Sequence, residues 1–579
     1  MLLRHACLPI PPHPHELIIT KYAQKIQILY EMTWFMLKYK QYAKGGLMNK
    51  VATYLNEHLT GEVLTNSAVI SESEQDKSVI TRRPEMVARV AHVNDIRKIM
   101  RFCSQLAEKG HILPVSVRGF GTDRTGAATG KGIMLDLTRH MRRVEEIDPK
   151  QQLIHVQAGI SHATVQSVLA THKGLGLPAV SYIDEDGTIG GAISAGAAGA
   201  LSSVYGTVGE STQRVEVVLS NGDVIQTERI SKRELGRKKG LTTLEGDIYR
   251  QLDSLLEDKA DLIEKLKSDD YETTGYSGIT EIKGKDGSID LTPLFVGSQG
   301  SLGIISEAIL KSDFSKPEIT VVTAAYKTMK DAQQAIDTAL DSKATTVEMI
   351  DGRIFKRAAT QGKHMEWAPK ECYEGAMVLA IFADFSERNR AKAVKKLTKK
   401  LDDSGEINVL DFESAHSSEL HSVLSLASNP AGQNEIVPGV FSGIQLPLIQ
   451  LDRFLSELSD LEKKYATSLP VFVDASSGFV DLLPVFMMKK ISDRQKIVKL
   501  SSELAKLLPE LGGSFAAHGG DGRFKSSVMY PLMDNEEREL YEKIKKIFDP
   551  LGVLNPGIKS EVPTKELVAE INAWCRLHD

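Results

Sequence analysis

The sequence predicts two successive α+β domains, and three observations lead to this fold class. Glycine-rich segments lie between runs of residues that read as strands. Up to about Leu310, short apolar runs with the two-residue period of strands are interleaved with stretches of helical period. From Lys316 onward strands and helices alternate, which is typical of a sheet with helices packed on it. A chain of 579 residues is long enough for two or three domains.

The elements of the first domain follow from periodicity and turn signals. Asn94 to Gly110 has the apolar spacing of an amphipathic helix, with Asn94 as the expected N-cap and Gly110 as the stop. Asn221 and Gly222 stand between two extended runs, and this pair is typical of a hairpin turn. The expected strands are 112–117, 133–137, 153–157, 215–219 and 224–226, and further expected helices are 162–171 and 247–267.

The second domain is predicted in the same way. Its expected strands are 319–326, 345–349 and 376–383, and its expected helices are 331–340, 388–401, 451–465 and 493–508.

The glycine-rich segments indicate a phosphate-bearing ligand. They read Arg118-Gly-Phe-Gly-Thr-Asp-Arg-Thr-Gly126, Gly187-Thr-Ile-Gly-Gly-Ala-Ile-Ser194 and Val296-Gly-Ser-Gln-Gly-Ser-Leu-Gly-Ile-Ile305. Closely spaced glycines let backbone N–H groups approach phosphate oxygens. A nicotinamide-binding loop would carry Gly-x-Gly-x-x-Gly between a strand and a helix. The first segment has another spacing, and the first two are expected between extended runs rather than at the start of a helix. A long, bent ligand held mainly by loops is therefore expected.

Composition excludes several classes of protein. The net charge of −5 gives no reason to expect nucleic-acid binding. The cysteines lie far apart, which argues against a structural zinc, an iron–sulfur cluster or a disulfide framework. Reduced thiols and a cytoplasmic location are expected. The cysteines are Cys7, Cys103, Cys372 and Cys575.

Five motifs in one order carry a family resemblance. They are residues 114–137, Val156-Gln-Ala-Gly-Ile160 with the Thr-Ile-Gly-Gly segment, Tyr205-Gly206, the Gly-Ser-Gln-Gly-Ser-Leu-Gly-Ile-Ile block, and, near the C-terminus, Ala516-Ala-His518-Gly with Phe548-Asp-Pro-Leu-Gly-Val-Leu-Asn-Pro-Gly557. The chain resembles FAD-linked oxidases of the vanillyl-alcohol-oxidase type over roughly residues 50 to 560. Within that family it is most similar to the D-lactate dehydrogenase and glycolate oxidase subunit group.

The resemblance implies a domain plan and a cofactor. A PCMH-type FAD-binding domain is expected over 49–312, an FAD-linked oxidase C-terminal (cap) domain over 313–560, and a tail over 561–579. Residues 1–48 would be an N-terminal extension, or translation would start at Met48. Non-covalent FAD is expected, because some relatives bond the flavin to a histidine near the first loop and none lies between His111 and His140.

The same resemblance implies the residues that contact the cofactor. At Gln299 the family usually has a glutamate, which is a departure. The implied FAD-binding residues are Arg118, Gly119, Gly121, Thr122, Gly126, Thr188, Gly190, Gly191, Ser194, Tyr205, Gly206, Ile304, Ile305 and Asn555.

The implied activity is oxidation of a small D-2-hydroxy acid, such as D-lactate, by hydride transfer to flavin N5. A base near the flavin must take the hydroxyl proton, and His518 is expected to be that catalytic residue. The electrons would pass to a quinone, a cytochrome or another carrier. An alcohol or sugar oxidase, an alkyl-glycerone-phosphate-synthase-like flavoenzyme and a flavin-binding subunit without turnover are the alternatives.

Departures in the cap keep these alternatives open. Relatives that bind a metal use two histidines and a glutamate, where this chain has Asp474, Asp481 and Ala517. No metal is therefore expected, and a site of oxygen ligands from Asp474, Asp481 and Asp521 is the alternative. The family's substrate-carboxylate arginine is missing from residues 419–424, and Arg523 and Lys525 are candidates to replace it.

The basic helix expected over 388–401 has two readings. A solvated outer face is one, and docking on an anionic membrane surface is the other. The expected partners are thus a small hydroxy acid or alcohol and an electron acceptor, with at most peripheral contact to the inner face of the membrane.

Overall fold

The computed structural model describes residues 44–172, 174–177, 187–199, 201–267, 274–314, 319–401, 405–411, 415–428 and 434–577. Most of the expected N-terminal extension lies outside them. The chain divides into two compact units, one up to Glu57 and one from His58 onward. Helix α2 (Lys44–His58) contains Met48. Everything below concerns the second unit.

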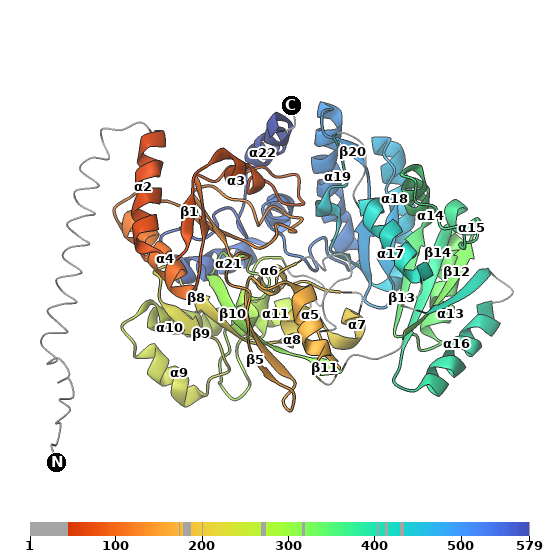
Figure 1. Ribbon diagram of the computed structural model, residues 1–579, viewed down its shortest axis with the longest axis horizontal. Coiled ribbons are helices and arrows are strands. Elements are labelled where there is room, and N and C mark those ends of the chain that lie inside the picture. The colour runs from red at the N-terminus through yellow and green to blue at the C-terminus, as the bar shows by residue number, and fades with distance from the viewer. Residues whose placement is uncertain are drawn as a thin grey trace, which may run out of the picture. The chain divides into compact units, whose positions relative to one another are not determined.

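The first sheet has the order β1-β2-β4-β3, and β2, β4 and β3 run parallel. Figure 1 labels its first strand, β1, near the red end of the colour range. Helix α4 (Val93–Glu108) connects β2 to β3 and buries the apolar face that its period predicts. Asn94 is not its N-cap as expected, because the helix begins at Val93 and the N-cap position is His92, two residues earlier. The buried carboxylate of Asp95 instead accepts hydrogen bonds from the backbone N–H groups of Gly61 and Ala91. The strands are β1 (Glu62–Leu64), β2 (Met86–Arg89), β3 (Val115–Arg118) and β4 (Ile133–Asp136).

The second sheet is antiparallel and has the order β5-β6-β10-β8-β9. The predicted hairpin between β8 and β9 is confirmed. Gly222 has a φ of +82° there, and its N–H donates to the carbonyl of Leu219 at 2.9 Å. Strand β5 was not expected, because its two apolar residues, Val144 and Ile147, are three positions apart and do not follow the two-residue period of a strand. The strands are β5 (Val144–Asp148), β6 (Leu153–Gln157), β8 (Thr212–Val218), β9 (Val224–Gln226) and β10 (Ile304–Lys311).

Helices surround these two sheets. The single helix expected over 247–267 is in fact two, α10 and α11, which meet at Lys259. The helices are α3 (Ser67–Glu72), α5 (His162–Ala170), α6 (Ile189–Ala195), α7 (Ser202–Tyr205), α8 (Val208–Ser211), α9 (Lys232–Lys239), α10 (Leu244–Asp258), α11 (Ala260–Lys267) and α12 (Thr292–Phe295), and β7 (Leu175–Gly176) pairs with β11 (Asp313–Phe314).

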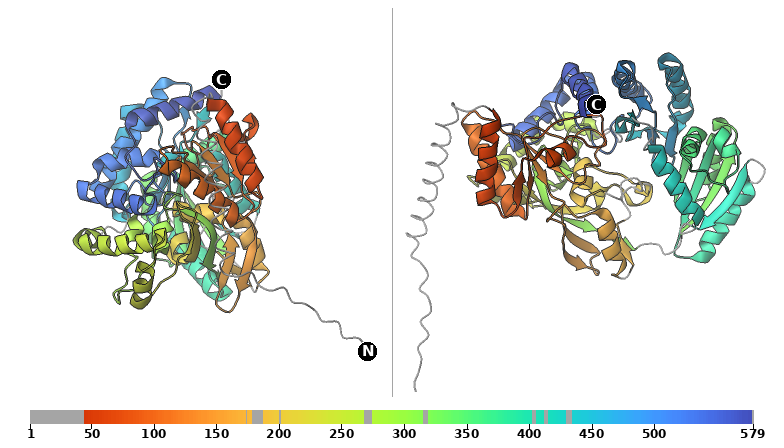
Figure 2. Two further views of the ribbon diagram at one scale, coloured as in Figure 1. Left: turned by 90° about the vertical axis from the view of Figure 1, so that its left-hand side faces the viewer. Right: turned by 45° about the horizontal axis from the view of Figure 1, so that its top comes forward.

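The cap is built on a seven-stranded antiparallel sheet, β15-β12-β14-β13-β18-β19-β17. Every residue of β14 is buried, which explains its unbroken apolar sequence. Helices cover both faces of the sheet (Figure 2): α13, α16, α18 and α19 pack on one face, and α14 and α17 on the other. The strands are β12 (Ile319–Tyr326), β13 (Thr346–Asp351), β14 (Ala376–Ala383), β15 (Glu406–Asp411), β17 (Ile444–Gln445), β18 (Val471–Asp474) and β19 (Phe479–Leu482); β16 (Glu435–Ile436) pairs with β20 (Phe486–Met487).

The cap helices were largely predicted. The helices are α13 (Met329–Leu340), α14 (Gly352–Thr360), α15 (Glu371–Glu374), α16 (Glu387–Leu401), α17 (Ala415–Ser428), α18 (Leu451–Tyr465) and α19 (Ile491–Glu510).

Across the sheet, Glu348 of β13 is paired in register with Asp474 of β18, and Asp474 with Phe479 of β19. Side chains at paired positions share a face, so these three residues lie in one row.

After the cap, the chain returns to the first domain through α20 (Phe524–Met529), α21 (Asn535–Phe548) and α22 (Thr564–Leu577). Val115 of β3 donates its N–H to the carbonyl of Val553 at 2.9 Å. Arg82 is 7% exposed, and α22 binds it through Glu566 at 2.8 Å and Glu570 at 2.5 Å. The tail is therefore a docked helix. None of the helices in the described part of the chain is long and apolar enough to cross a membrane.

Candidate active site

A cavity lies where the glycine-rich segments of the first domain meet the cap. Its cavity volume is about 180 Å³, and it opens to solvent. Five stretches of the chain, within residues 117–128, 187–198, 299–305, 439–443 and 518–525, line it together with Leu137, Ala158, His162 and Asp481. Half of the lining residues are glycine or alanine. A wall of such small residues lets a bulky, flat ligand reach the backbone.

The first glycine loop joins β3 to β4 without a helix, as predicted. Gly121 has a φ of +72°, and a Cβ atom on Gly119 would lie 2.5 Å from the hydroxyl oxygen of Thr188. Only glycine fits this approach of the first loop to the second. Asp123 fixes the turn, because its Oδ1 accepts from the backbone N–H groups of Thr125 and Ala127, each at 2.8 Å.

The second segment departs from the expectation, because it opens the short helix α6. Thr188 is the N-cap, and its hydroxyl accepts from the N–H of Gly191 at 3.1 Å. Paired glycines disfavour a helix, so the sequence pointed away from one. Gly190 is required here for another reason: its Cβ atom would lie 2.6 Å from that of Ala158. Close packing against Ala158, the residue that follows β6, therefore requires glycine at position 190.

The third segment links the first loop to the cap. Gln299 donates from Nε2 to the Asp123 carboxylate at 3.2 Å and accepts at Oε1 from the N–H of Gly522 at 2.8 Å. A glutamate at this position would place its charge against that of Asp123. The amide therefore suits this chain. Ile304 and Ile305, which begin β10, line the cavity as expected.

His518 lies in the lining at the cap end of the cavity. Its ring packs on that of Phe479 in β19, with 4.4 Å between the ring centroids and 57° between the planes. The backbone around it is held on both sides: Ala517 donates its N–H to the carbonyl of Gly443 at 2.9 Å, and Gly519 donates to that of Gly196 at 3.4 Å. The imidazole is thus positioned by both domains.

Arg124 was missed by sequence reasoning. It belongs to the first glycine loop, lines the cavity and donates from Nη1 to the hydroxyl of Ser442 in the cap at 3.0 Å. The same nitrogen lies 3.9 Å from Oδ2 of Asp481, which also lines the cavity. A long cation within a loop of otherwise small residues was the available signal. Its partners, however, lie more than 300 residues further along the chain.

Of the two candidates to replace the missing arginine, only Lys525 lines the cavity. Its Nζ donates to the carbonyls of Ser442 at 2.5 Å and Phe515 at 2.6 Å. Arg523 is fully buried and donates to the carbonyls of Thr129 and Pro556, at 2.8 and 3.1 Å. Burial and, to a smaller extent, the neighbouring charge of Arg82 lower the pKa of this guanidinium to about 9. Arg523 therefore belongs to the core beneath the site.

The aspartates considered as metal ligands do not converge. Asp474 is engaged in its own turn, where Oδ2 accepts from the hydroxyl of Ser477 at 2.5 Å, and burial raises its pKa. Asp521 is fully buried and pairs with Lys559 at 2.6 Å. Only Asp481 lines the cavity. Within the described residues, no three histidine, cysteine or carboxylate side chains lie close enough to hold a metal ion.

The other residues expected to bind the cofactor fall into two groups, those that line the main cavity and those that lie outside its lining. Arg118 lines a neighbouring cavity and donates to the carbonyl of Ala128 at 3.1 Å. Among the described residues, those expected but placed outside the main lining are Arg118, Gly126, Tyr205, Gly206 and Asn555, and those within it are Gly119, Gly121, Thr122, Thr188, Gly190, Gly191, Ser194, Ile304, Ile305 and His518.

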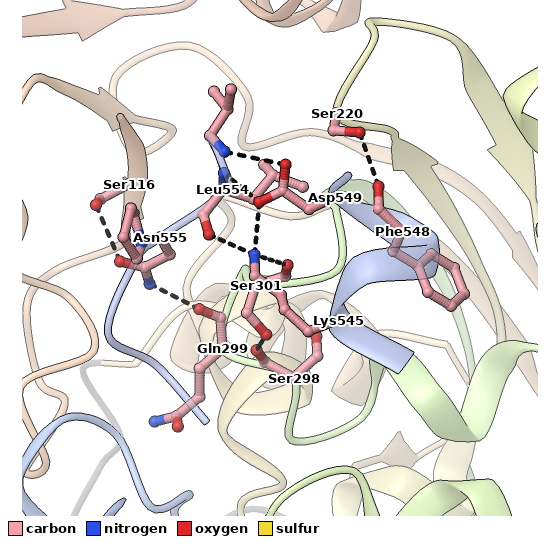
Figure 3. Close-up of polar contacts among 12 residues, drawn as sticks. Ser116, Ser220, Ser298, Gln299, Ser301, Lys545, Phe548, Asp549, Leu554 and Asn555 are labelled. Carbon is pink, nitrogen blue, oxygen red and sulfur yellow. Dashed lines mark hydrogen bonds and ion pairs between the residues drawn. The ribbon is translucent and has the colours of Figure 1, made fainter. Parts of the chain in front are cut away.

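Asn555 supports the loops that form the lining (Figure 3). Its Nδ2 donates to the carbonyl of Gln299 at 2.8 Å, and its Oδ1 accepts from the hydroxyl of Ser116 at 2.9 Å. Lys545, close by, joins Asp549 at 2.6 Å to the carbonyl of Ser301 at 2.7 Å. The C-terminal segment thereby fastens the third glycine segment to β3.

The cavity fits a flavin dinucleotide. Glycine loops on one side offer backbone donors for a pyrophosphate, and the small-residue wall of 190–198 leaves room for a planar ring system. The apolar side chains of Ile304, Ile305 and Leu137 suit an aromatic base.

Comparisons with known proteins agree with this geometry. The "FAD binding domain" family matches residues 84–228, and the "FAD linked oxidases, C-terminal domain" family matches residues 315–558. The D-2-hydroxyglutarate dehydrogenase of Pantoea ananatis (strain AJ13355) is 25% identical over 536 residues, covering 88% of this chain and 52% of that protein. The glycolate oxidase subunit GlcD of Bacillus subtilis (strain 168) is 25% identical over 499 residues, covering 84% and 91%. The chain thus spans about half the length of the D-2-hydroxyglutarate dehydrogenases it matches.

Solved structures share the fold. The 4-ethylphenol oxidase from Gulosibacter chungangensis, in its isoeugenol complex, superposes with a TM-score of 0.64 at 16% identity over 91% of this chain and 99% of its own. Substrate-bound p-cresol methylhydroxylase gives a TM-score of 0.61 at 14% identity, over 90% and 98%. The chain belongs to the FAD-linked oxidases, with a PCMH-type FAD-binding domain followed by an FAD-linked oxidase C-terminal domain, and FAD is its cofactor.

Proposed function

We propose that this flavoprotein oxidises a small D-2-hydroxy acid, with D-lactate as the first candidate, and passes the electrons to a quinone, a cytochrome or another carrier. The observation that carries the proposal is the convergence of Arg124 and His518 on one short cap segment. Arg124 binds the hydroxyl of Ser442, and the next residue, Gly443, packs against the carbonyl of His518. A cation for a carboxylate and a base for a hydroxyl thus lie at the same end of the cavity.

Different residues perform the separate tasks of the proposed oxidation. FAD supplies the hydride acceptor at N5 when it is bound. The guanidinium of Arg124 binds the substrate carboxylate and so orients the hydroxyl-bearing carbon. The imidazole of His518 takes the hydroxyl proton. The glycine loops around Gly119 and Gly190 hold the cofactor by its phosphates.

Lys525 supports this end of the cavity. Its ammonium donates to two backbone carbonyls of the cap and lies 4.8 Å from the centre of the Phe515 ring. This charge adds to the positive potential that a carboxylate would meet.

An anaerobic titration tests the proposal. FAD-loaded protein is mixed with D-lactate, L-lactate, glycolate or D-2-hydroxyglutarate, and the visible flavin band is followed. We expect one D-acid to bleach the band, and we expect His518→Ala to abolish the bleaching while the band itself remains. A flavin band that none of the acids bleaches would contradict the proposal. Arg143→Ala is the matched control, since Arg143 is exposed and pairs with Glu145.

The lining also supports a second class of substrate. Asp481 presents a carboxylate to the cavity, and carboxylates accept hydrogen bonds from hydroxyl groups. This favours an alcohol or sugar oxidase, or an enzyme similar to alkyl-glycerone-phosphate synthase, as the alternative. A polyol or alcohol that bleaches the band where the acids fail would support it. A band that no substrate bleaches would favour a flavin-binding subunit without turnover.

Contact with an anionic membrane is proposed for helix α16. Five lysines of this helix are exposed, and Phe385, just before it, is 60% exposed. Arg390 is excluded from this surface, because it is buried and donates to the hydroxyl of Thr320 at 3.1 Å. We expect co-sedimentation with phosphatidylglycerol vesicles that is lost in Lys395→Glu/Lys399→Glu. No binding by the unaltered protein would contradict membrane contact and would favour a solvated helix face in a cytoplasmic protein.

A further inference from the structure

A second cavity lies beside the first, on the outer side of the first glycine loop. Its cavity volume is about 610 Å³, and it opens to solvent. Gly119 and Phe120 line both cavities, so this short segment is the wall that they share. Nothing in the proposed oxidation uses the second cavity.

The topology gathers four arginines at this cavity. Strands β2, β4 and β3 run parallel, and their last residues, Arg89, Asp136 and Arg118, are paired in register. The carboxyl ends of parallel strands meet at one edge of a sheet, so both arginines emerge there. Arg139 and Arg142 lie on the segment that follows β4. All four line the cavity.

The charges of the lining do not cancel. Two carboxylates, those of Glu72 and Asp136, share it with the four guanidinium groups. Asp136 is already engaged, because its Oδ1 accepts from the N–H of Thr138 at 2.8 Å and from its hydroxyl at 2.6 Å. Arg89 lies 3.0 Å from Glu62 and 3.8 Å from Asp136.

The two arginines after β4 are available to a ligand. Arg139 and Arg142 are exposed, and no carboxylate in the described part of the chain lies within ion-pair distance of either. Arg118 is fixed from behind, since Nη1 donates to the carbonyl of Ala128 at 3.1 Å and Nη2 to that of Glu72 at 3.2 Å. The cavity therefore has Arg118, held by backbone carbonyls, on one side and the exposed Arg139 and Arg142 at its rim.

We propose that this second cavity binds a phosphate-bearing small molecule, with a nucleotide as the ligand class. Planar guanidinium groups bind phosphate oxygens in pairs. The hydroxyls of Thr138, Ser161 and Thr164 also line the cavity and can donate to the same oxygens. Phe120 is 49% exposed at the rim, where its ring can stack on a base.

Calorimetry on the FAD-saturated full chain tests this inference, so that the flavin site is already filled. The probes are ADP, AMP and pyrophosphate. We expect ADP to bind with a dissociation constant below roughly 1 mM, and Arg139→Ala/Arg142→Ala to weaken it by about tenfold or more. Phe120→Ala should weaken ADP and AMP but leave pyrophosphate unchanged, since only a base can stack.

Arg143→Ala is the matched control. This arginine is the immediate neighbour of Arg142, is exposed, pairs with Glu145 and lies outside the cavity lining. An equal loss of affinity in Arg143→Ala would show diffuse surface attraction and overturn the proposal. So would the absence of binding for all three probes, or displacement of the bound ADP by further FAD. The flavin band confirms that each variant is folded.

Discussion

Arg124 of the first glycine loop faces Asp481 of the cap sheet, with 3.9 Å between Nη1 and Oδ2. Asp481 is held from the other side, because its Oδ1 accepts from the N–H of Gly443 at 2.9 Å. The pair is 22% and 14% exposed, so solvent screens it only partly. Since both side chains line the cavity, this contact affects the charge that the carboxylate of the proposed substrate would meet.

Replacing Arg124 should weaken substrate binding. A hydrogen bond to a charged group contributes about 1.5–3 kcal/mol, so Arg124→Ala should raise KM for the hydroxy acid by roughly 10- to 100-fold. Arg124→Lys should recover only part of this, because an ammonium cannot bind a carboxylate in two places. Steady-state kinetics measure the effect, and Arg143→Ala should leave KM unchanged. An unchanged KM in Arg124→Ala would remove this residue from the site.

Asp481→Asn should change KM for the hydroxy acid in the direction opposite to that expected for Arg124→Ala. The amide can still accept from the N–H of Gly443, but it no longer neutralises Arg124. We expect KM for a hydroxy acid to fall by about threefold, in line with the modest strength of a partly exposed ion pair. For an alcohol substrate the same change should raise KM, since the amide is a poorer acceptor for hydroxyl groups. The direction of the change thus distinguishes the two substrate classes.

His518→Gln should affect turnover rather than binding. Removing a general base costs about 10²- to 10⁴-fold in rate, so kcat should fall by that order while KM changes little. Rapid-mixing measurement of flavin reduction gives the rate directly. Phe479→Leu serves as a comparison, because it keeps His518 but removes the ring that packs on it at 4.4 Å. For Phe479→Leu, a smaller decrease in kcat than in His518→Gln is expected, with full FAD binding.

Long elements with strong periods could be predicted from the sequence. Strand β14 (Ala376–Ala383) and helix α18 (Leu451–Tyr465) were placed at their observed ends, because an unbroken apolar run or a regular apolar stripe dominates each. Helix α6 was not predicted, because its two glycines indicate a loop. What stabilises it is the Thr188 cap and packing on Ala158, and the second contact is not local.

The candidate site was predicted in part for a similar reason. The glycine loops and His518 stand out locally, and the structure brings them into one lining. The role proposed for Arg124 depends on Ser442, 318 residues away in sequence, and on Asp481 in a strand of the other domain. The different positions of Lys525 and Arg523 also could not be predicted without the folded structure. They are two positions apart, yet one lines the cavity and the other is buried beneath it.

Asn555 should be important for stability. Its amide makes two donated and two accepted hydrogen bonds, and its φ of +36° lies in the left-handed region. Leaving buried partners unsatisfied costs about 1–3 kcal/mol, so both Asn555→Gly and Asn555→Ala should lower Tm. Alanine should lower the free energy of unfolding by about 1 kcal/mol more than glycine does, because glycine adopts this backbone conformation without strain and alanine does not. Thermal unfolding of FAD-loaded protein tests the order, with the exposed Asn389→Ala as control.

Stability should fall as the pH rises, because of Glu348. Burial, together with the charge of Asp474 opposite it in the sheet, raises the pKa of Glu348 from 4.5 to about 8. Between these values the unfolded chain releases the proton and the folded chain keeps it. The free energy of unfolding must therefore decrease with increasing pH, by up to about 1.4 kcal/mol per unit, and level off above pH 8.

Glu348→Gln should remove the part of this dependence that Glu348 contributes, since a neutral amide has no proton to lose. The difference in stability between the variant and the unaltered protein should be constant below about pH 4.5 and shift in favour of the variant up to about pH 8, with urea unfolding as the measurement. Asp474→Asn should narrow the pH range of this decrease rather than remove it, because the burial of Glu348 remains. Glu374→Gln, at an exposed position of the same domain, should leave the decrease unchanged. Equal pH slopes for Glu348→Gln and the unaltered protein would show that Glu348 is ionised in the folded cap at neutral pH.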